Sequence, residues 1–205
     1  MTSTHDMNNP GSSQPRSRAI VIIIALVSIV PFGLAWYYAN HPELIEKTSN
    51  YGMLIQPAQQ LDVARILAQP LRPQNGLERI KGRWLLLQVA TGPCVQECAE
   101  TLHKTHQGWL MLNKEMPRVQ RLLLASPESK AAESDAVRND DALLTAGLTQ
   151  PVLQALTRAM GKPPGDGMVI LVDPFANLVL WYDAGFDPYK MVKDLKHLLK
   201  ASQIG

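Results

Sequence analysis

The stretch WLLLQVATGPCVQEC, residues 84–98, joins a short apolar run to a pair of cysteines through a turn-like Thr-Gly-Pro. The run at 84–90 is almost wholly apolar, which is typical of a strand buried on both faces of a parallel sheet. The turn ends this run, and a helix is expected from about Cys94 to Met116. The sequence therefore predicts a strand that delivers Cys94 to the start of a helix.

The rest of the chain is predicted to continue with alternating strands and helices. The predicted elements are a strand at 119–125, a polar and acidic surface loop or irregular insertion at 126–147, a helix at 149–160, strands at 168–172 and 178–182 that form a hairpin, and an amphipathic helix at 188–200. A βαβ unit followed by a ββα unit predicts a thioredoxin-like α/β fold. In such folds the start of the first helix lies at the carboxyl end of a central strand, where ligands bind.

A second apolar stretch, at residues 19–39, indicates the cellular compartment in which the cysteines lie. It carries no charge and corresponds to about 31 Å of helix, close to the roughly 30 Å hydrocarbon core of a bilayer. Its length and the absence of a small-residue cleavage site favour an uncleaved anchor over a cleaved signal peptide. Arg16 and Arg18 precede it, whereas the first lysine after it is Lys47. This asymmetry predicts a cytoplasmic N-terminus and, in the inner membrane of a bacterium, a periplasmic C-terminal part where thiols meet oxidising conditions.

Length and composition divide the chain into four parts. Residues 1–18 are polar and are expected to be a disordered cytoplasmic tail, and residues 19–39 are expected to be the transmembrane helix. Residues 40–76, with several prolines, are expected to be a tether, and residues 77–205 are expected to form one thioredoxin-like domain. The net charge is only +2 and there is no basic stretch, so nucleic acid is not an expected partner.

The two cysteines of the chain, Cys94 and Cys98, are the candidate site residues. A cysteine at a helix N-terminus meets the positive end of the helix dipole, which stabilises a thiolate. Residues four apart in a helix have Cα atoms about 6 Å apart, within the usual range for a disulfide. Two thiolates at this spacing also suit a soft cation such as Cu(I). The spacing therefore allows a redox pair, a copper ligand pair or a purely structural disulfide.

Several short motifs resemble the Sco family. They are Lys81-Gly82-Arg83-Trp84 before the apolar strand, Cys94-x-x-x-Cys98, and Leu171-Val172-Asp173-Pro174 with Asn177. The chain is similar, more closely still, to small proteobacterial membrane proteins that resemble Sco and accompany cytochrome oxidase assembly factors. The resemblance implies a membrane-anchored thioredoxin fold that assists assembly of the copper-A centre of cytochrome c oxidase, with an oxidase subunit or copper and thiol assembly factors as partners.

The chain departs from the Sco pattern at two points. Sco proteins have a proline directly after the second cysteine, where this chain has Ala99. The third copper ligand of Sco is a histidine about eight residues before the Asp-Pro of the hairpin, and this count ends at Gly165, next to Asp166. His103 and His106 lie roughly 140° and 80° around the helix from Cys98, so both are expected to be solvated surface residues.

Three functions remain open from the sequence. The first is a periplasmic factor for oxidase assembly that uses Cys94 and Cys98 for thiol-disulfide exchange, for Cu(I) handling, or for both. The second is a general periplasmic thiol-disulfide oxidoreductase, although such enzymes usually carry Cys-x-x-Cys and not Cys-x-x-x-Cys. The third is a non-catalytic assembly subunit that keeps the fold only as a binding surface. No cofactor other than copper is expected.

Overall fold

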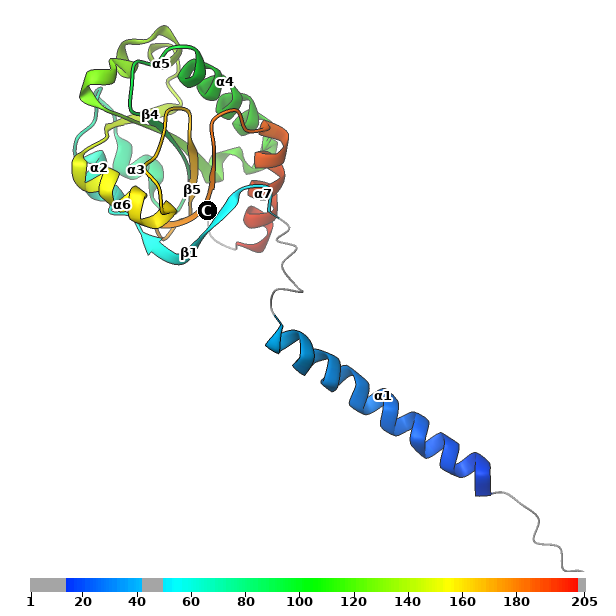
Figure 1. Cartoon of the computed structure of the whole chain (residues 1–205). Coiled ribbons are helices and arrows are strands. Elements are labelled where there is room, and N and C mark those ends of the chain that lie inside the picture. The colour runs from blue at the N-terminus through cyan, green and yellow to red at the C-terminus, as the bar shows by residue number, and fades with distance from the viewer. Residues whose placement is uncertain (1–13, 42–49, 203–205) are drawn as a thin grey trace, which may run out of the picture. The chain divides into compact units, whose positions relative to one another are not determined.

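The computed structural model describes residues 14–41 and 50–202, which fall into two compact units, residues 1–49 and 50–205. The described part of the first unit contains helix α1 (Gln14–Asn40). Its stretch Ala19–Asn40 is long and apolar enough to cross a membrane, as judged by length and composition (Figure 1). The predicted apolar helix at 19–39 is therefore confirmed. The first residues of α1 fall in the predicted disordered tail, of which residues 1–13 lie outside the described residues.

The second unit is built on a six-stranded sheet with the order β1-β6-β5-β2-β3-β4. Its strands are β1 (Met53–Gln60), β2 (Trp84–Ala90), β3 (Val119–Ala125), β4 (Leu143–Gly147), β5 (Val169–Val172) and β6 (Asn177–Tyr182). Strands β2, β3 and β4 are parallel, whereas β5 is antiparallel to β2 and to β6, and β1 is antiparallel to β6. This mixed sheet is the predicted thioredoxin-like arrangement, with β2 inside the sheet.

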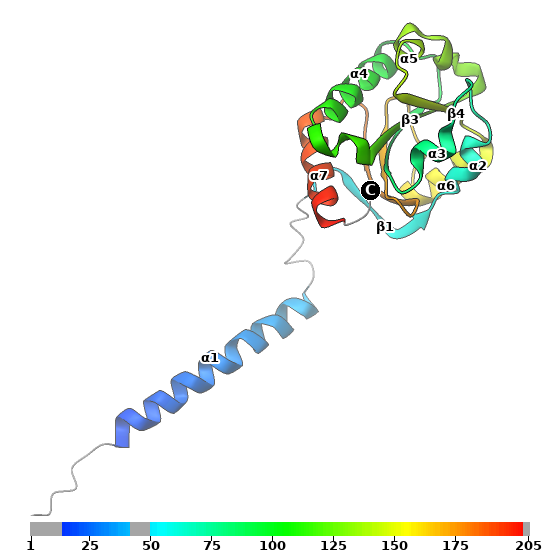
Figure 2. The same cartoon turned by 180° about the vertical axis from the view of Figure 1, so that it is seen from behind.

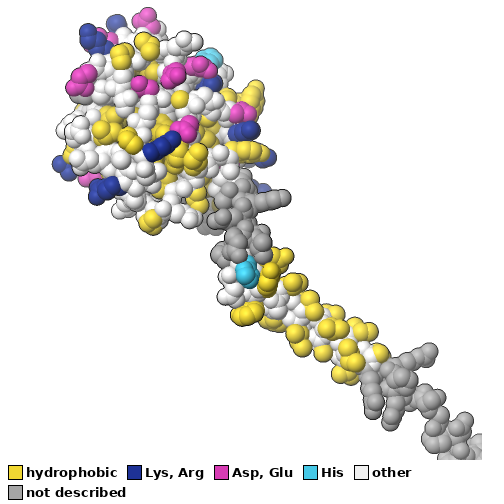
Figure 3. All heavy atoms as spheres, viewed as in Figure 1, with side chains coloured by type: hydrophobic (Ala, Val, Ile, Leu, Met, Phe, Trp, Pro, Cys, Tyr) yellow, Lys and Arg dark blue, Asp and Glu magenta, His cyan; other side chains and the backbone are white. Residues whose placement is uncertain are grey.

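Helices cover both faces of the sheet. They are α2 (Val63–Leu67), α3 (Gly76–Ile80), α4 (Gln96–Leu110), α5 (Asp135–Arg138), α6 (Gln150–Met160) and α7 (Pro188–Ala201). Figures 1 and 2 show α4 and α7 together on one face, and α2, α3 and α6 on the other. On the face of this unit seen in Figure 3, acidic and basic side chains are interspersed, while hydrophobic side chains cover α1.

Strand β2 is apolar throughout because both of its faces are covered. Leu85, Leu87 and Val89 pack in one core with residues of α2 and α6. Trp84 and Leu86 point to the other face and pack with residues of α7. Side chains alternate between the two faces of a strand, so each face of β2 contributes to its own core. One residue of this buried strand, Gln88, is polar.

Most predicted elements are confirmed, but the helix after β2 is shorter than expected. Helix α4 begins at Gln96 and not at Cys94, and it ends at Leu110 and not at Met116. A 3-10 helix, Asn113–Arg118, follows it and contains Pro117. Asn113, the first residue of this 3-10 helix, has a positive φ of 51°, so the chain does not continue in the α-helical conformation there.

The structure corrects the expectation of a surface loop at 126–147. This segment forms short 3-10 turns, helix α5 and the edge strand β4. Strand β4 is only five residues long and follows a charged stretch, so its apolar residues Leu143 and Leu144 give no periodic signal in the sequence. Both are nevertheless buried, because β4 completes the parallel side of the sheet.

The structure also differs from the expected tether at 40–76. Residues 42–49 lie outside the described residues, and the compact unit begins at Asn50, well before the expected boundary at residue 77. Strand β1 forms the edge of the sheet beside β6, and the following helix α2 contributes Ile66 to the core. A short helix at 61–67 is expected from the sequence and is confirmed as α2, whereas the proline within β1 hides that strand, because proline is tolerated on edge strands.

Candidate functional site

The two cysteines lie at the junction between β2 and α4. Strand β2 ends at Ala90, three residues form a turn, and Cys94 precedes the first residue of α4 by two positions. Cys98 lies in the first turn of α4. The two residues form a disulfide with their Cα atoms 4.9 Å apart. The sequence prediction that Cys94 is delivered to a helix start is therefore confirmed.

The two cysteines are buried to different extents. Cys98 is 2% exposed and packs in a small apolar cluster with Ala90 and Leu102. Cys94 is only half-buried and lies at the border of this cluster. The N-cap residue of α4 is Val95, whose side chain makes no cap hydrogen bond, so no side chain competes for the amides at the start of the helix. A thiolate at Cys94 is therefore both accessible and close to the positive end of the helix dipole.

Asp166 fixes the turn that leads into Cys94. One of its carboxylate oxygens, Oδ1, accepts hydrogen bonds from the backbone N–H and hydroxyl of Thr91 and from the N–H of Gly92 at 2.9 Å. A Cβ atom at Gly92 would lie 2.9 Å from the other carboxylate oxygen, so glycine permits this close approach. The sequence placed Asp166 next to the expected histidine position but gave no sign of this contact.

The donors near the cysteines do not complete a three-ligand copper site of the Sco type. Among the described residues there is no group of three His, Cys, Asp or Glu side chains arranged to hold a metal. His103 is exposed on α4, as expected. Met168, a thioether near the hairpin, packs in the core on the opposite face of the sheet from Cys98. Cys94 and Cys98 remain as the only soft donors that the site brings together within the described chain.

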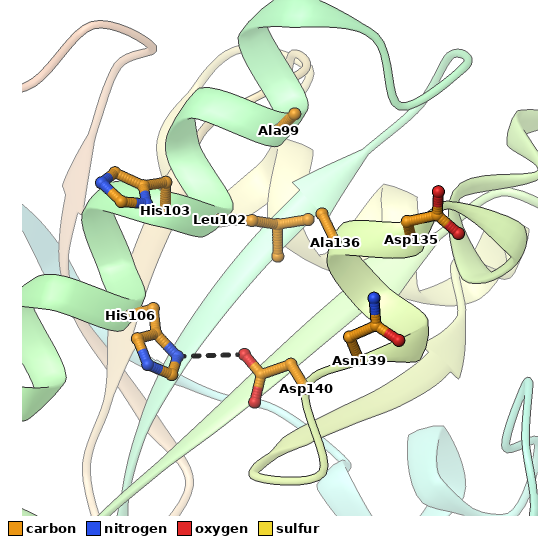
Figure 4. A pocket seen from close by; sticks show the side chains of 8 residues that line it. All are labelled: Ala99, Leu102, His103, His106, Asp135, Ala136, Asn139 and Asp140. Carbon is orange, nitrogen blue, oxygen red and sulfur yellow. Dashed lines mark hydrogen bonds and ion pairs between the residues drawn. The ribbon is translucent and has the colours of Figure 1, made fainter.

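His106 is not the solvated residue that the helix geometry predicts. Its Nδ1 lies 3.2 Å from Asp140 Oδ2 and 3.0 Å from the guanidinium of Arg121, and its side chain is 37% exposed. Figure 4 shows the His106 ring in contact with the Asp140 carboxylate, and both side chains line a pocket of about 400 Å³ between α4 and α5. The expectation is wrong because the segment after β3 folds back over α4 and carries Asp140 with it.

Arg121, on β3, is almost wholly buried and forms an ion pair with Asp140. Burial lowers the pKa of Arg121 from its usual value, although the neighbouring Asp140 carboxylate opposes this shift. Burial alone would raise the pKa of Asp140, but the Arg121 cation, with His106, outweighs burial and lowers that pKa. No sequence motif indicates the pair, because Arg121 and Asp140 are 19 positions apart and Arg121 lies in a strand.

A polar path connects this ion pair with the buried cysteine. Arg121 donates to the hydroxyl of Thr105 at 3.4 Å, and the Thr105 hydroxyl lies 3.5 Å from Oε1 of Gln88. Gln88 in turn donates through Nε2 to the backbone carbonyl of Cys98 at 3.1 Å and lies 3.9 Å from its Sγ. Gln88 and Thr105 are both buried.

Solved structures of known proteins are similar to this chain in fold. Solved structures with the same fold include apo Sco1 of Thermus thermophilus, with a TM-score of 0.52 and 19% identity over 73% of this chain and 96% of that one. They also include copper-bound Sco1 of yeast, with a TM-score of 0.48 and 16% identity over 61% and 83% of the two chains. A third is the thioredoxin domain of a thiol-disulfide oxidoreductase of Bacteroides vulgatus, with a TM-score of 0.47 and 13% identity over 72% and 97%.

The likeness to the Thermus thermophilus structure, at 19% identity, is one of fold, and it confirms the thioredoxin-like fold that the sequence predicts. Comparison with curated protein sequences gives no significant match. A family model described as the transmembrane-like, thioredoxin-like, C-terminal domain matches residues 84–202, from the first residue of β2 to just beyond the end of α7. This match covers more than half of the chain and contains both cysteines. The chain therefore belongs to the transmembrane-like, thioredoxin-like C-terminal domain family.

Proposed function

We propose that this chain is a membrane-anchored thiol-disulfide exchange protein that assists assembly of cytochrome c oxidase at its copper-A centre. The observation that carries the proposal is the Cys94–Cys98 disulfide at the start of α4, with one half-buried and one fully buried cysteine. A purely structural disulfide gains little from closing so short a loop, because the chain entropy that it removes is small. Unequal burial suits an attacking and a resolving cysteine.

The proposed reaction begins with the reduced protein. The Cys94 thiolate attacks one sulfur of a partner's disulfide, so that a mixed disulfide forms, the partner's S–S bond breaks and the leaving thiolate takes up a proton. The Cys98 thiolate then attacks the Cys94 sulfur. The Cys94–Cys98 disulfide forms, and the partner's second sulfur leaves and takes up the proton that Cys98 has lost. Two electrons pass to the partner's disulfide, and a second protein dithiol must reduce the Cys94–Cys98 disulfide again.

The apolar helix α1 supports the membrane anchor. We place it in the inner membrane of a bacterium, with the N-terminus in the cytoplasm and residues after the span in the periplasm, because Arg16 and Arg18 precede it. The likeness to Sco supports an oxidase subunit, or copper and thiol assembly factors, as the partners. In the periplasm the partner's cysteines are prone to oxidation, so a tethered reductant has a substrate there.

Binding of Cu(I) by the reduced pair is a second candidate. Two thiolates from residues with Cα atoms 4.9 Å apart supply soft ligands that Cu(I) prefers. The missing histidine makes this candidate weaker than exchange, because a third ligand would have to come from the partner. A general thiol-disulfide oxidoreductase would use the same cysteines with a broader choice of partners, and a scaffold subunit would not need them.

The experiment that tests the proposal is disulfide trapping in bacterial membranes with the full chain. We expect Cys98→Ser to accumulate a covalent adduct with a partner, because Cys94 attacks and the resolving thiol is absent. The matched control, Cys94→Ser, should trap much less, and a reductant should release the adduct. Recovery of oxidase subunits or copper and thiol assembly factors supports the assembly role, whereas recovery of many unrelated proteins supports the general oxidoreductase.

Titration of the reduced chain with Cu(I), in competition with a chelator, tests the second candidate. Either cysteine substitution should abolish tight binding if both thiolates are ligands. His103→Ala serves as the control and should leave binding unchanged, since this side chain is exposed on α4. A chain that neither traps a partner nor binds Cu(I) leaves only the scaffold function.

A further inference from the structure

We propose that the exposed face of α7 docks on anionic lipid headgroups and holds the compact unit that carries the disulfide against the membrane surface. The proposal rests on the membrane anchor of the proposed function and goes beyond it, because that function gives α7 no role. The one acidic residue of α7, Asp194, is buried. The exposed face, which we call the basic face, is made of Lys190, Lys193, Lys196, His197 and Lys200.

The spacing of these residues places them on one side of the helix. An α-helix turns by about 100° per residue, so the side chains of the basic face fall within an arc of about 120°. Met191, Leu195 and Leu199 lie on the other side and pack in a core with residues of β2 and β6. Because the core uses the apolar side of α7, its charges are what it offers to a lipid. The basic face therefore suits the surface of a membrane and not insertion into it.

The lysines of the basic face lack carboxylate partners. Within residues 50–202 none of them forms an ion pair. The two acidic residues that precede α7 are engaged elsewhere, since Asp183 pairs with Lys162 at 2.8 Å and Asp187 accepts from the N–H of Tyr189 at 2.9 Å. The whole chain has a net charge of only +2, so the basic face is a local excess of charge. Such an excess is relieved by anions from outside the chain.

The composition of the basic face favours lipid over an acidic protein. Its cations are lysines without arginine, and lysine is depleted at protein–protein interfaces, where arginine is enriched. The ring of Tyr51, which is 48% exposed, has the ammonium groups of Lys190 and Lys193 at 5.5 and 5.3 Å from its centroid. Tyr189, next to Lys190 in the sequence, is 73% exposed. Lysine and tyrosine together are typical of the membrane–water interface.

The chain enters the compact unit beside the basic face. The buried Asp194 of α7 accepts hydrogen bonds from the backbone N–H groups of Tyr51 and Gly52 at 2.8 and 2.9 Å. Figures 1 and 2 both show the start of β1 beside α7. Helix α1 ends at Asn40 and the compact unit begins at Asn50, and ten residues of chain reach at most about 35 Å. An anchor on so short a connection gives the basic face a high effective concentration at the membrane, so weak contacts suffice.

The strength of docking follows from the number of charges. A lysine near an anionic membrane surface strengthens binding about five-fold, so removing two lysines should weaken docking about 25-fold. The attraction falls off within about 8 Å at physiological salt, so it should weaken further when salt is added. Both effects belong to the side chains of the basic face and not to the net charge of the chain.

The test uses the full chain in lipid nanodiscs, made either of phosphatidylcholine alone or of phosphatidylcholine with phosphatidylglycerol. The rate at which each lysine is methylated by formaldehyde and a reductant is measured by mass spectrometry. We expect Lys190 and Lys200 to react at least about five-fold more slowly in the anionic discs. Lys81 and Lys130, which are exposed outside α7, should react equally in both discs. Added salt should remove the difference.

Two variants with the same net charge separate the basic face from charge in general. Lys193→Gln combined with Lys196→Gln should weaken docking about 25-fold, so the remaining lysines of α7 should react almost as fast in the anionic discs as in neutral ones. The matched control, Lys81→Gln combined with Lys130→Gln, should keep the protection of α7. Equal protection in the two variants would overturn the proposal.

Other results would also overturn it. Equal rates in the two kinds of disc exclude docking on anionic lipid, and slower methylation of every lysine points to the surface potential alone. Protection of α7 that requires added membrane proteins, and not anionic lipid, would assign the basic face to an acidic protein. A chain that does not stay with the discs contradicts both the anchor and this inference, whereas a chain that stays without protected lysines contradicts this inference alone.

Discussion

Replacing Asp140 with asparagine should destabilise the domain, because it removes the charge that balances a buried cation. Arg121 is 1% exposed, and its Nε has no hydrogen-bond partner within the described chain. Asp140 is the only carboxylate with which it forms an ion pair there. In Asp140→Asn the amide keeps an oxygen that can accept from the N–H groups of Ala142 and Leu143, as Oδ1 does at 3.1 Å. The NH2 group of asparagine then takes the place of Oδ2, so the substitution removes both the negative charge and the acceptor that face Arg121.

The expected cost follows from how the two side chains are placed. Breaking a buried ion pair by removing one partner costs about 3–5 kcal/mol, since the other charge is left uncompensated. Asp140 is 12% exposed and water reaches the nearby His106, so the lower end, about 3 kcal/mol, applies. A domain of this size is stable by about 5–15 kcal/mol. The loss is therefore a large part of the total.

The assay is urea unfolding of the full chain in detergent micelles, followed by near-ultraviolet circular dichroism. Asp141→Asn is the matched control, because the neighbouring Asp141 is exposed, and its effect should stay within about 0.5 kcal/mol. Arg121→Met combined with Asp140→Asn should be more stable than Asp140→Asn alone, since the double variant removes the stranded cation. A cost below about 1 kcal/mol for Asp140→Asn, or simple additivity in the double variant, would refute the reasoning.

The same pair predicts a dependence on pH. The pKa of Asp140 is lowered in the folded protein from its ordinary value of 3.8. A depressed carboxyl pKa contributes stability that is fully present above the pKa of the unfolded chain and is lost as the pH falls through the folded value. The difference in unfolding free energy between the wild type and Asp140→Asn should therefore be constant near neutral pH and shrink below about pH 4. A difference that grows in acid would contradict the sign.

Two further predictions concern the turn and the topology. Asp166→Ala should change the rate at which Cys94 of the reduced chain is alkylated, because it frees the Thr91 and Gly92 amides. Asp166→Asn should restore much of the wild-type rate. Equal rates in all three chains would show that the turn does not depend on this carboxylate. A reporter that is active only outside the cytoplasm, fused after Gly205, should be active if Arg16 and Arg18 orient the span as proposed, and an inactive but well-expressed fusion would reverse the assignment.

The sequence predicts the interior of the fold better than its edges. Strands β2 and β3 and the hairpin of β5 and β6 are recognisable because continuous apolar runs end in turn residues. The turn of the hairpin follows an Asp-Pro sequence that is typical of turns. In the structure the Asp173 carboxylate accepts hydrogen bonds from the N–H groups of Phe175 and Asn177. Edge strands β1 and β4 are missed, because prolines interrupt the first and a charged segment precedes the second.

The polar part of the site is not predictable in the same way. The spacing of Cys94 and Cys98 gives their proximity directly, because both belong to one turn of chain. The contacts of Gln88, Asp166 and Arg121 join residues that are far apart in the sequence, so no local period reveals them. Gln88 and Arg121 are polar residues in buried strands, and the sequence gives no reason for them. Only the folded structure supplies the hydrogen-bond and ion-pair partners that offset the free-energy cost of burying them.

The residue beside the position expected for the Sco histidine is a further argument for the proposed thiol chemistry over copper. In this chain Asp166 lies beside that position, and its carboxylate accepts three hydrogen bonds from the turn before Cys94. A carboxylate is a hard ligand that suits Cu(I) poorly, and this one is engaged in shaping the turn. Asp166, beside the position expected for the histidine, thus helps to shape the turn before Cys94. Asp166 holds the turn before Cys94 and the Gln88 amide lies beside Cys98, whereas the described residues bring no third copper ligand to this pair.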